Sequence, residues 1–330
     1  MSKKVLVIGS NSFSGADFID LLLEQRDYQV LGVSRSAEKP PLFLPYLDQP
    51  QHRFRFQQID LNHDLPELFA LLRREKPAWI VNFAAQSEVA PSWEHPEHWF
   101  QTNAVAIAAL GNFLRHQDWL ERYLHVSSPE VYGTCEGVVS ESAPLNPSTP
   151  YAASKAAGDL MLTTLVKQFG FPLLSVRATN VYGPHQQLFK IIPRTAIFLR
   201  LGRKIELHGG GQAVKSYIHI RDVSQGELAM LERGRLGELY HLSPAQGVAV
   251  REVVRLICQL RGQDFAAWTE SVDERPGQDK AYVISSHKAR SELGWSDSIP
   301  LETGLQQVLG WIERYWDEIQ RQPLHYLHKP

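Results

Sequence analysis

Short apolar runs alternate with helix-like periodicity through the first half of the chain. Runs of strand length occupy residues 5–8, 30–33, 54–59, 79–84, 123–126 and 173–176. Apolar residues recur at three- and four-residue spacing, as on one face of a helix, over residues 16–25, 65–74, 102–116 and 151–169. Strands that alternate with helices through short connections predict an α/β fold with a doubly wound parallel sheet.

This regular alternation loosens after about residue 180. The later elements predicted from periodicity are helices at residues 192–201, 251–260 and 301–315 and a strand at 216–220. We predict a dinucleotide-binding domain over residues 1–177, to which about 216–243 returns. A smaller substrate-binding domain would comprise residues 178–215 and 244–330. We expect the ligand in the cleft between these domains.

A glycine-bearing turn joins the first predicted strand to the first helix. Its candidate cofactor-binding residues are Gly9, Asn11, Ser12, Phe13 and Gly15. A turn of this kind holds the pyrophosphate of a dinucleotide at the helix N-terminus, which is typical of a Rossmann-type sheet. Ser12 stands at the middle glycine position of the usual spacing, where its side chain narrows the approach but its hydroxyl offers a hydrogen bond to phosphate. The alternative is an ordinary turn between a strand and a helix.

The ends of the next two strands bear on the choice of cofactor. The second strand ends in Ser34, Arg35 and Ser36, where an acidic residue would bind the ribose 2′-hydroxyl of NAD. A cation with hydroxyls suits a 2′-phosphate better, so Arg35 slightly favours NADP over NAD, unless it is an ordinary surface residue. At the end of the third strand, Asp60, followed by Leu61, would bind the adenine amino group or else cap the next helix.

The strongest catalytic signal is the pair Tyr151 and Lys155. Their spacing of four residues puts both on one face of a predicted helix. An ammonium beside a phenol stabilises the phenolate and lowers the pKa of the phenol, which makes Tyr151 a base near neutral pH. Ser128, at the end of the preceding strand, would orient the substrate oxygen.

With these residues the chain resembles the extended short-chain dehydrogenase/reductase family, in its nucleotide-sugar branch. The resemblance covers nearly the whole chain, and its further motifs lie at residues 82–87, 130–133, 177–184, 209–211, 217–223, 275–277 and 293–295. Residues 128–133 are most similar to the corresponding segment of dTDP-glucose 4,6-dehydratases. The resemblance implies that Tyr151 takes the O4 proton while hydride leaves C4, that Glu130 then removes the C5 proton, and that hydride returns to C6. A 4-keto-6-deoxy sugar would form, with the cofactor retained through turnover.

The resemblance also implies which residues contact the cofactor and the substrate. Ala84 and Ala85 would contact the cofactor, together with Tyr151 and Lys155. The substrate, a nucleotide-diphosphate sugar, would contact Ser87, Ser128, Asn180, Lys190, His208, Lys215 and Arg275. Each cation among them has the alternative of an ordinary surface charge. Pro129 stands where the related enzymes have an acid, so departure of water would be assisted by Glu130, by Ser128 or by water itself.

Composition limits the other classes of partner. The 330 residues contain 34 Lys and Arg and 36 Asp and Glu, a net charge of −2, which offers no global field for nucleic acid or an anionic membrane. No apolar run approaches the ~18 residues of a membrane span. The two cysteines, Cys135 and Cys258, form neither a disulfide framework nor a metal cluster, which suits the cytoplasm. We expect a homodimer through residues 102–116 and 151–169, as in the family's four-helix interface.

Three other functions remain open. A UDP-glucuronate decarboxylase also has a glutamate before its Val-Tyr-Gly segment, although Arg275-Pro276-Gly277 favours the dehydratase. A nucleotide-sugar 4-epimerase needs no carboxylate at the position of Glu130. The third is a non-catalytic cofactor-binding sensor on the same fold, which would not need Tyr151 and Lys155; their presence argues against it.

Overall fold

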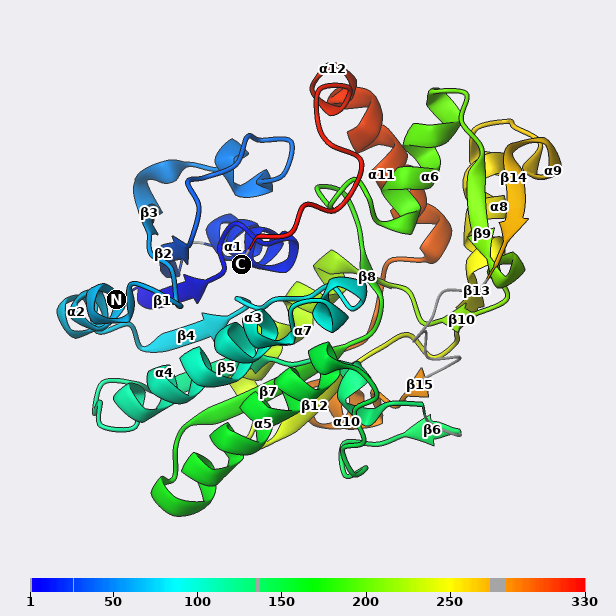
Figure 1. The fold of residues 1–330 in the computed structure, drawn as a ribbon. Coiled ribbons are helices and arrows are strands. Elements are labelled where there is room, and N and C mark those ends of the chain that lie inside the picture. Colours follow the sequence, from blue (N-terminus) through cyan, green and yellow to red (C-terminus); the bar gives the residue numbers. More distant parts are fainter. Residues whose placement is uncertain (1, 26, 135–136, 274–282, 330) are drawn as a thin grey trace.

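Seven parallel strands form one sheet through the centre of the molecule, in the order β12-β7-β5-β4-β1-β2-β3 (Figure 1). The computed structural model describes residues 2–25, 27–134, 137–273 and 283–329. The strands are β1 (Lys3–Ile8), β2 (Tyr28–Ser34), β3 (Phe54–Gln58), β4 (Trp79–Asn82), β5 (Arg122–Val126), β7 (Leu173–Ala178) and β12 (Leu239–Leu242). The predicted doubly wound parallel sheet is confirmed. The strand order reverses between β1 and β4, and ligands of such sheets bind beyond the carboxyl ends of the strands at that point.

Helices cover both faces of the sheet, as Figure 1 shows. One face packs against α1 (Phe13–Glu24), α7 (Ile220–Arg233) and α10 (His287–Leu293). The other packs against α2 (Leu65–Glu75), α4 (Ala106–Leu114) and α5 (Pro150–Phe169). Successive β1 residues alternate between the two cores, because Val5 and Val7 belong to the first and Leu6 and Ile8 to the second. A strand buried on both faces is therefore apolar at every position.

A third core lies beyond the carboxyl ends of the strands. It contains residues of α6 (Ile191–Arg200), β9 (Ile205–His208), α8 (Val250–Leu260) and α11 (Leu301–Arg314). The remaining short elements are α3 (Pro96–Phe100), β6 (Val138–Val139), β8 (Val181–Tyr182), β10 (Val214–Lys215), β11 (Ile218–His219), β13 (Val248–Ala249), α9 (Phe265–Trp268), β14 (Thr269–Val272), β15 (Val283–Ile284) and α12 (Trp316–Ile319). The predicted division into two domains stays a prediction.

The structure departs from the predicted elements in two places. The helix predicted over residues 102–116 begins as a π-helical turn, Gln101–Val105, before α4. The strand predicted at residues 216–220 is only the two-residue β11, because Ile220 already begins α7, with the His219 side chain accepting a hydrogen bond from the Arg221 backbone N–H. The later part of residues 216–243 contains β12, which pairs with β7 at the edge of the sheet.

The C-terminal segment lies outside these layers. After α12 the last described residues run back across the molecule (Figure 1), where His328 stacks on His95, His98 and Trp99. Among the described helices, none is both long enough and apolar enough to cross a membrane.

Candidate active site

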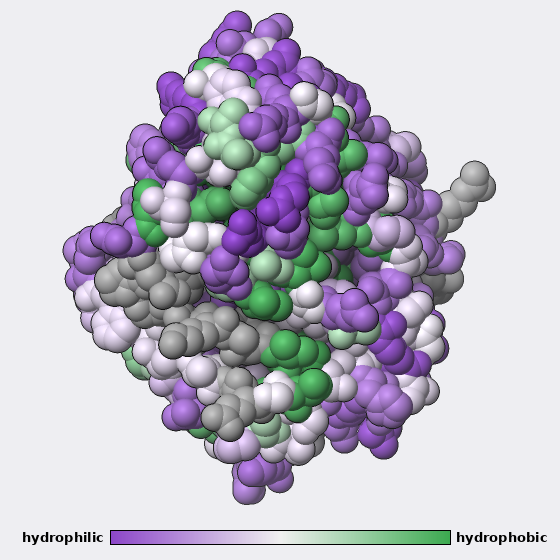
Figure 2. Space-filling view, turned by 90° about the vertical axis from the view of Figure 1, so that its right-hand side faces the viewer, coloured by the Kyte–Doolittle hydropathy of each residue, from purple (hydrophilic) through white to green (hydrophobic). Residues whose placement is uncertain are grey.

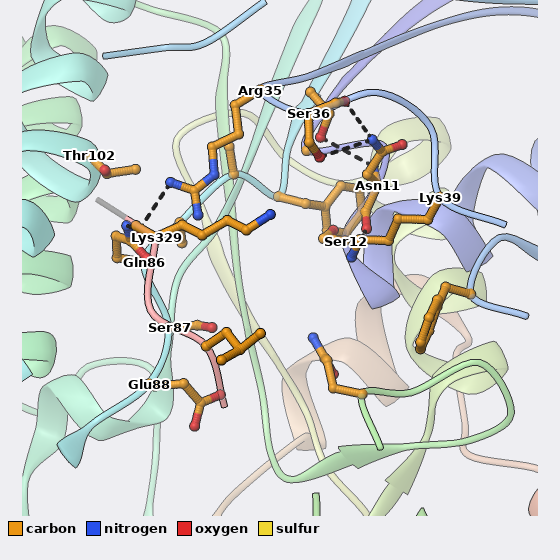
Figure 3. Close-up of a pocket in the computed structure, with 18 of the residues that line it drawn as sticks. Asn11, Ser12, Arg35, Ser36, Lys39, Gln86, Ser87, Glu88, Thr102 and Lys329 are labelled. Carbon is orange, nitrogen blue, oxygen red and sulfur yellow. Dashed lines mark hydrogen bonds between the residues drawn. The ribbon is translucent and has the colours of Figure 1, made fainter. Parts of the chain in front are cut away.

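A cavity of about 500 Å³ lies at the carboxyl ends of β1, β2, β3 and β4 (Figure 3). Most of the predicted cofactor positions line it, as does one predicted substrate position. These residues are Gly9, Asn11, Ser12, Ser34, Arg35, Asp60, Leu61, Ala84, Ala85 and Ser87. Phe13 and Gly15 do not line the cavity, because they belong to the first turn of α1 behind it.

The turn between β1 and α1 requires two of its glycines. Gly9 has a φ of 84°, and a Cβ there would lie 2.7 Å from the Ala84 nitrogen. A Cβ on Gly15 would lie 2.4 Å from the Gly9 carbonyl oxygen. The hydroxyl of Ser12 caps α1 by accepting a hydrogen bond of 3.0 Å from the Gly15 N–H. Its proton can still be donated to a ligand.

The segment after β2 is tied to this turn through Asn11. The Asn11 Nδ2 donates to the carbonyl oxygens of Ser36 at 2.8 Å and Ala37 at 2.9 Å, and the Lys39 ammonium donates to the Asn11 carbonyl oxygen at 2.9 Å. The Asn11 Oδ1 is buried and has no hydrogen-bond partner among the described residues. A buried acceptor without a partner is uncommon in folded proteins, so the Asn11 Oδ1 fits a bound ligand that donates an N–H or O–H group at this position.

Asp60 has a local structural role at the cavity wall. Its Oδ1 accepts a hydrogen bond of 2.8 Å from the Asn62 N–H and closes the turn after β3. The residue that precedes α2 is Asp64. The alternative of Asp60 as a helix cap is therefore wrong, and its carboxylate faces the cavity.

Tyr151 and Lys155 lie in the first turns of α5, and neither lines the described cavity. Thr149 caps this helix by accepting a hydrogen bond from the Ala152 N–H. Both side chains are buried, with 8% of Tyr151 and 2% of Lys155 exposed. The Lys155 ammonium donates a hydrogen bond of 2.7 Å to the Val126 carbonyl oxygen at the end of β5.

The pKa values of this pair differ from the prediction. Burial raises the pKa of Tyr151, the negative charge of Glu130 raises it further, and a hydrogen bond with Ser128 opposes both effects. The predicted lowering of the pKa of Tyr151 is wrong for the structure, because burial is the largest effect on it and the charge of Glu130 acts in the same direction. Burial lowers the pKa of Lys155 to about 8, against the opposing charge of Asp159.

Charged residues are buried behind Lys155, in a network that the sequence analysis did not single out. Asp159, one turn further along α5, accepts hydrogen bonds of 2.6 Å from the Ser127 hydroxyl and from Arg177. His125 lies 3.4 Å from its other carboxylate oxygen. Burial disfavours ionisation of Asp159, but the adjacent His125 ring and the positive charges of Arg177 and Lys155 hold its pKa well below the usual range. Asp159 therefore supplies a fixed negative charge near Lys155.

The segment after β4 is attached to the helix that carries Tyr151. Asn103, from the π-helical turn, exchanges two hydrogen bonds with the backbone of Gln86, at 3.0 and 2.9 Å. Its Nδ2 also donates to the Ser154 hydroxyl at 2.9 Å. Gly158 permits this approach, because a Cβ there would lie 2.4 Å from the Asn103 carbonyl oxygen. The cavity wall at residues 84–87 is thus fixed relative to Tyr151.

Ser128 and Glu130 lie in the turn that follows β5. Ser128 precedes the 3₁₀ turn Pro129–Tyr132, and its hydroxyl accepts a hydrogen bond of 3.2 Å from the Glu130 N–H. Glu130 is half-buried, and its charge acts on Tyr151. The hydroxyl of Ser128, the carboxylate of Glu130 and the phenol of Tyr151 are therefore grouped at the carboxyl end of β5. Pro129, between the first two, has no acidic group.

The remaining predicted substrate residues lie outside the described cavity. The Lys190 ammonium lies 2.6 Å from a carboxylate oxygen of Glu88, which lines the cavity wall. The Oδ1 of Asn180, after β7, is buried without a partner among the described residues. His208 and Lys215 end β9 and β10, on the side of the molecule that Figure 2 faces, where hydrophobic residues gather in the middle. Arg275 lies outside the described residues.

Several residues of the cavity were missed by the sequence analysis. Lys39, Gln86 and Thr102 line it, and so do six residues after α12: Gln322, Pro323, His325, Tyr326, Leu327 and Lys329. Gln86 lay inside a recognised motif and could have been found there. The C-terminal residues carry no motif, and only the folded chain brings them to the cavity.

Comparisons with known proteins agree with this site. The family model described as GDP-mannose 4,6 dehydratase matches residues 6–308. A dTDP-glucose 4,6-dehydratase from Xanthomonas campestris pv. campestris is 34% identical over 260 residues, which are 73% of this chain and 74% of that protein. The dTDP-D-glucose 4,6-dehydratase of Bos taurus is 29% identical over 319 residues, 94% of this chain and 88% of the relative.

Solved structures show the same fold. DesIV, a dTDP-glucose 4,6-dehydratase from Streptomyces venezuelae solved with NAD bound, superposes with a TM-score of 0.88 at 30% identity and covers 96% of this chain and 98% of its own. A UDP-glucuronic acid 4-epimerase from Bacillus cereus, at 23% identity, has a TM-score of 0.85 with coverage of 94% and 99%, which shows the fold alone. The family match over most of the chain, together with the residues grouped around the cavity, identifies this chain as a member of the GDP-mannose 4,6 dehydratase family of NAD-dependent nucleotide-sugar dehydratases.

Proposed function

We propose that this chain forms a 4-keto-6-deoxy sugar from a nucleotide-diphosphate sugar, with Ser128, Glu130, Tyr151 and Lys155 as its catalytic residues. The observation that carries the proposal is the grouping of Ser128 and the half-buried Glu130 in the turn after β5, with Glu130 near enough to the buried Tyr151 for its charge to raise the pKa of that phenol. Dehydration needs two bases, one for the O4 proton and one for the C5 proton. Epimerisation at C4 needs only the first.

Each catalytic residue has a task that follows from its surroundings. Tyr151 accepts the O4 proton, and Ser128, bonded to it, orients the same oxygen. Lys155 keeps a positive charge close to the site, because Asp159 counteracts the effect of burial on its pKa. Glu130 removes the C5 proton once C4 is a ketone, and the protonated carboxyl then assists departure of the C6 hydroxyl in place of the acid that Pro129 lacks.

The cavity residues fit a nicotinamide dinucleotide. Gly9 leaves no room for a Cβ, and the Asn11 Oδ1 is a buried acceptor without a partner among the described residues. Gly9 and Ser12 would hold the pyrophosphate, and the Asn11 Oδ1 would accept a hydrogen bond from a hydroxyl of the cofactor. Asp60 would bind the adenine. Arg35 would bind the ribose side, where it can also accept the 2′-phosphate of NADP. When bound, the dinucleotide accepts hydride from C4 and returns it to C6, so it is retained through turnover.

The variant Glu130→Gln tests the second step. It keeps Tyr151 and Lys155, so it should form reduced nicotinamide and the 4-keto sugar but lose about 10²–10⁴-fold in the rate of dehydration. Near-ultraviolet absorbance of reduced nicotinamide and mass spectrometry of the sugar would detect this. Tyr151→Phe should prevent both signals, and Glu302→Gln, at an exposed glutamate of α11, should behave as wild type.

Isotope labelling separates the alternatives. In heavy water the dehydration product should carry deuterium at C5. A Glu130→Gln variant that dehydrates at the wild-type rate would refute the role of Glu130. A product that keeps its C6 hydroxyl and is inverted at C4 would identify a 4-epimerase, and carbon dioxide released from a 6-carboxylate substrate would identify a decarboxylase.

We also propose a homodimer and a cytoplasmic location. Val105, which precedes α4, is 54% exposed, and Leu160 on the adjacent helix α5 is 58% exposed. Two large exposed apolar side chains favour pairing of this face with the same face of a second copy. Leu160→Glu should yield a monomer in light scattering, whereas Leu236→Glu, at an equally exposed leucine elsewhere, should not. A monomeric wild type at micromolar concentration would reject the dimer.

The cytoplasmic location is supported by Cys258, a free and buried thiol.

A further inference from the structure

The C-terminal residues cross the opening of the cofactor cavity. Residues 322–329 run from the end of α12 toward the sheet (Figure 1), and six of them line the same cavity as the glycine turn. In Figure 3, Lys329 lies between Gln86 and Arg35, on the side of the cavity opposite Asn11 and Lys39. This segment, called the strap below, is therefore part of the cavity wall.

Specific contacts hold the strap in place at its end. The Lys329 carbonyl oxygen accepts hydrogen bonds from Gln86 Nε2 at 2.7 Å and from Arg35 Nη1 at 3.3 Å. Gln86 is itself fixed through Asn103 to the helix of Tyr151. Arg35 is the residue expected to choose the cofactor, so the strap contacts a predicted cofactor-binding residue as well as the cavity wall at Gln86.

His328 anchors the strap to α3 and the residue before it. Its ring stacks on His95, His98 and Trp99, with ring centroids 5.6, 5.2 and 5.2 Å apart. A hydrogen bond of 2.9 Å joins His328 Nε2 to His98 Nδ1. Tyr326 adds a ring contact with Phe189 at 5.6 Å. These are polar and aromatic contacts of moderate strength, so the strap can detach without unfolding the core.

Three cations meet at this cavity. Burial lowers the pKa of Lys39, and the positive charges of Lys329 and Arg35 lower it further, which places the three within electrostatic reach of one another. The Lys39 ammonium points at the turn between β1 and α1, where it binds the Asn11 carbonyl oxygen. Like charges grouped around a cavity repel one another, and a bound phosphate removes that repulsion.

We propose that residues 322–329 close over the bound dinucleotide as a strap, and that Lys329 joins Lys39 and Arg35 in binding one of its phosphates. The inference rests on the proposed use of a nicotinamide dinucleotide at this cavity. The cofactor enters and leaves only when His328 and the Lys329 carbonyl have released their partners. The strap thereby accounts for a cofactor that stays bound through turnover.

Truncation tests the strap as a barrier to release. A chain that ends at Tyr326 keeps the contact with Phe189 but lacks residues 327–330, including His328 and Lys329. Release of NADH, followed by its fluorescence after dilution into excess NAD, should accelerate at least roughly tenfold, the equivalent of one charge-assisted hydrogen bond. Arg321→Ala removes an exposed cation just outside the strap and should leave the release rate unchanged.

Lys329→Ala tests the phosphate contact separately. Competition with fluorescent NADH should show weaker binding of ADP, by roughly tenfold, and unchanged binding of adenosine, which has no phosphate. Equal weakening of ADP and adenosine would overturn the phosphate contact. Slower or unchanged release from the truncated chain, or tighter NADH binding to it, would overturn the strap and indicate a tail that competes with the cofactor. A wild-type chain that binds no dinucleotide would instead refute the proposed function.

Discussion

The buried Lys155 makes the fold less stable than it would be with an apolar residue, and this cost can be measured. Burial lowers the pKa of Lys155 to about 8 from an ordinary value of 10.5. At ~1.36 kcal/mol for each pKa unit, keeping the ammonium charged at neutral pH costs the folded state about 3 kcal/mol. The hydrogen bond to the Val126 carbonyl oxygen returns about 1–2 kcal/mol.

The variant Lys155→Met removes both contributions and conserves the shape of the side chain. We therefore expect it to raise the free energy of unfolding by about 1–2 kcal/mol at pH 7 and to abolish activity. The difference should depend on pH. Between pH 8 and 10.5 folded Lys155 has released its proton while the unfolded chain still binds one, so the wild type gains stability as pH rises and approaches the variant.

Urea denaturation of cofactor-free protein at a series of pH values measures this difference. Lys167→Met, an exposed lysine on the same helix, controls for loss of a charge and should show no such convergence. A Lys155→Met variant that is less stable than wild type at pH 7, or a difference that is constant from pH 7 to 10.5, would refute the reasoning.

Three further predictions concern the cofactor, the fold and the strap. Arg35→Asp should shift the bound dinucleotide toward NAD, as measured by mass spectrometry of the released cofactor; wild type that releases only NAD, with no change in the variant, would exclude Arg35 from selection. Asp222→Ala should cost about 3–5 kcal/mol in urea denaturation, because it leaves three hydrogen bonds to a fully buried carboxylate unmade. Below about pH 6, acid should release the strap and accelerate NADH release. The pKa of His328 is lowered when the strap is docked, so protonation of His328 favours the released strap. The variant His328→Phe should remove this pH dependence. The charged and titratable groups that face His328 are His98, His95, Arg35, Glu94 and Tyr326, whose hydroxyl lies 3.2 Å from His328 Nδ1.

The layered fold could be predicted because its cause is local in sequence. The central strands are short and mostly apolar, and the alternation of Leu6 and Val7 between two cores produces the continuous apolar pattern that was recognised. The glycine turn was predictable for a similar reason, since Gly9 and Gly15 are the positions at which a Cβ would collide with backbone. These signals depend on neighbours within one strand–helix unit.

Features that depend on distant partners could not be predicted. Spacing puts Tyr151 and Lys155 on one helix face, but the direction of the ammonium is set by the Val126 carbonyl oxygen on another element. The π-helical turn at residues 101–105 is fixed by the bonds of Asn103 to Gln86 and Ser154 and leaves no periodic signal. The strap lacks both periodicity and motif, because its contacts are made one by one with residues 230–294 positions away.

The buried charges behind the site are explained by chemistry rather than by stability. Apolar residues in place of a buried ion pair are often as stabilising or more so, and Asp159 with Arg177 forms such a pair. Burial alone would lower the pKa of Lys155 further, and the negative charge of Asp159 opposes this effect. With its pKa held at about 8, Lys155 stays mostly protonated at neutral pH beside a phenol whose own pKa burial has raised. Asp159 thus preserves the positive charge of Lys155 on the helix that carries Tyr151, and an apolar core behind that helix would lose it.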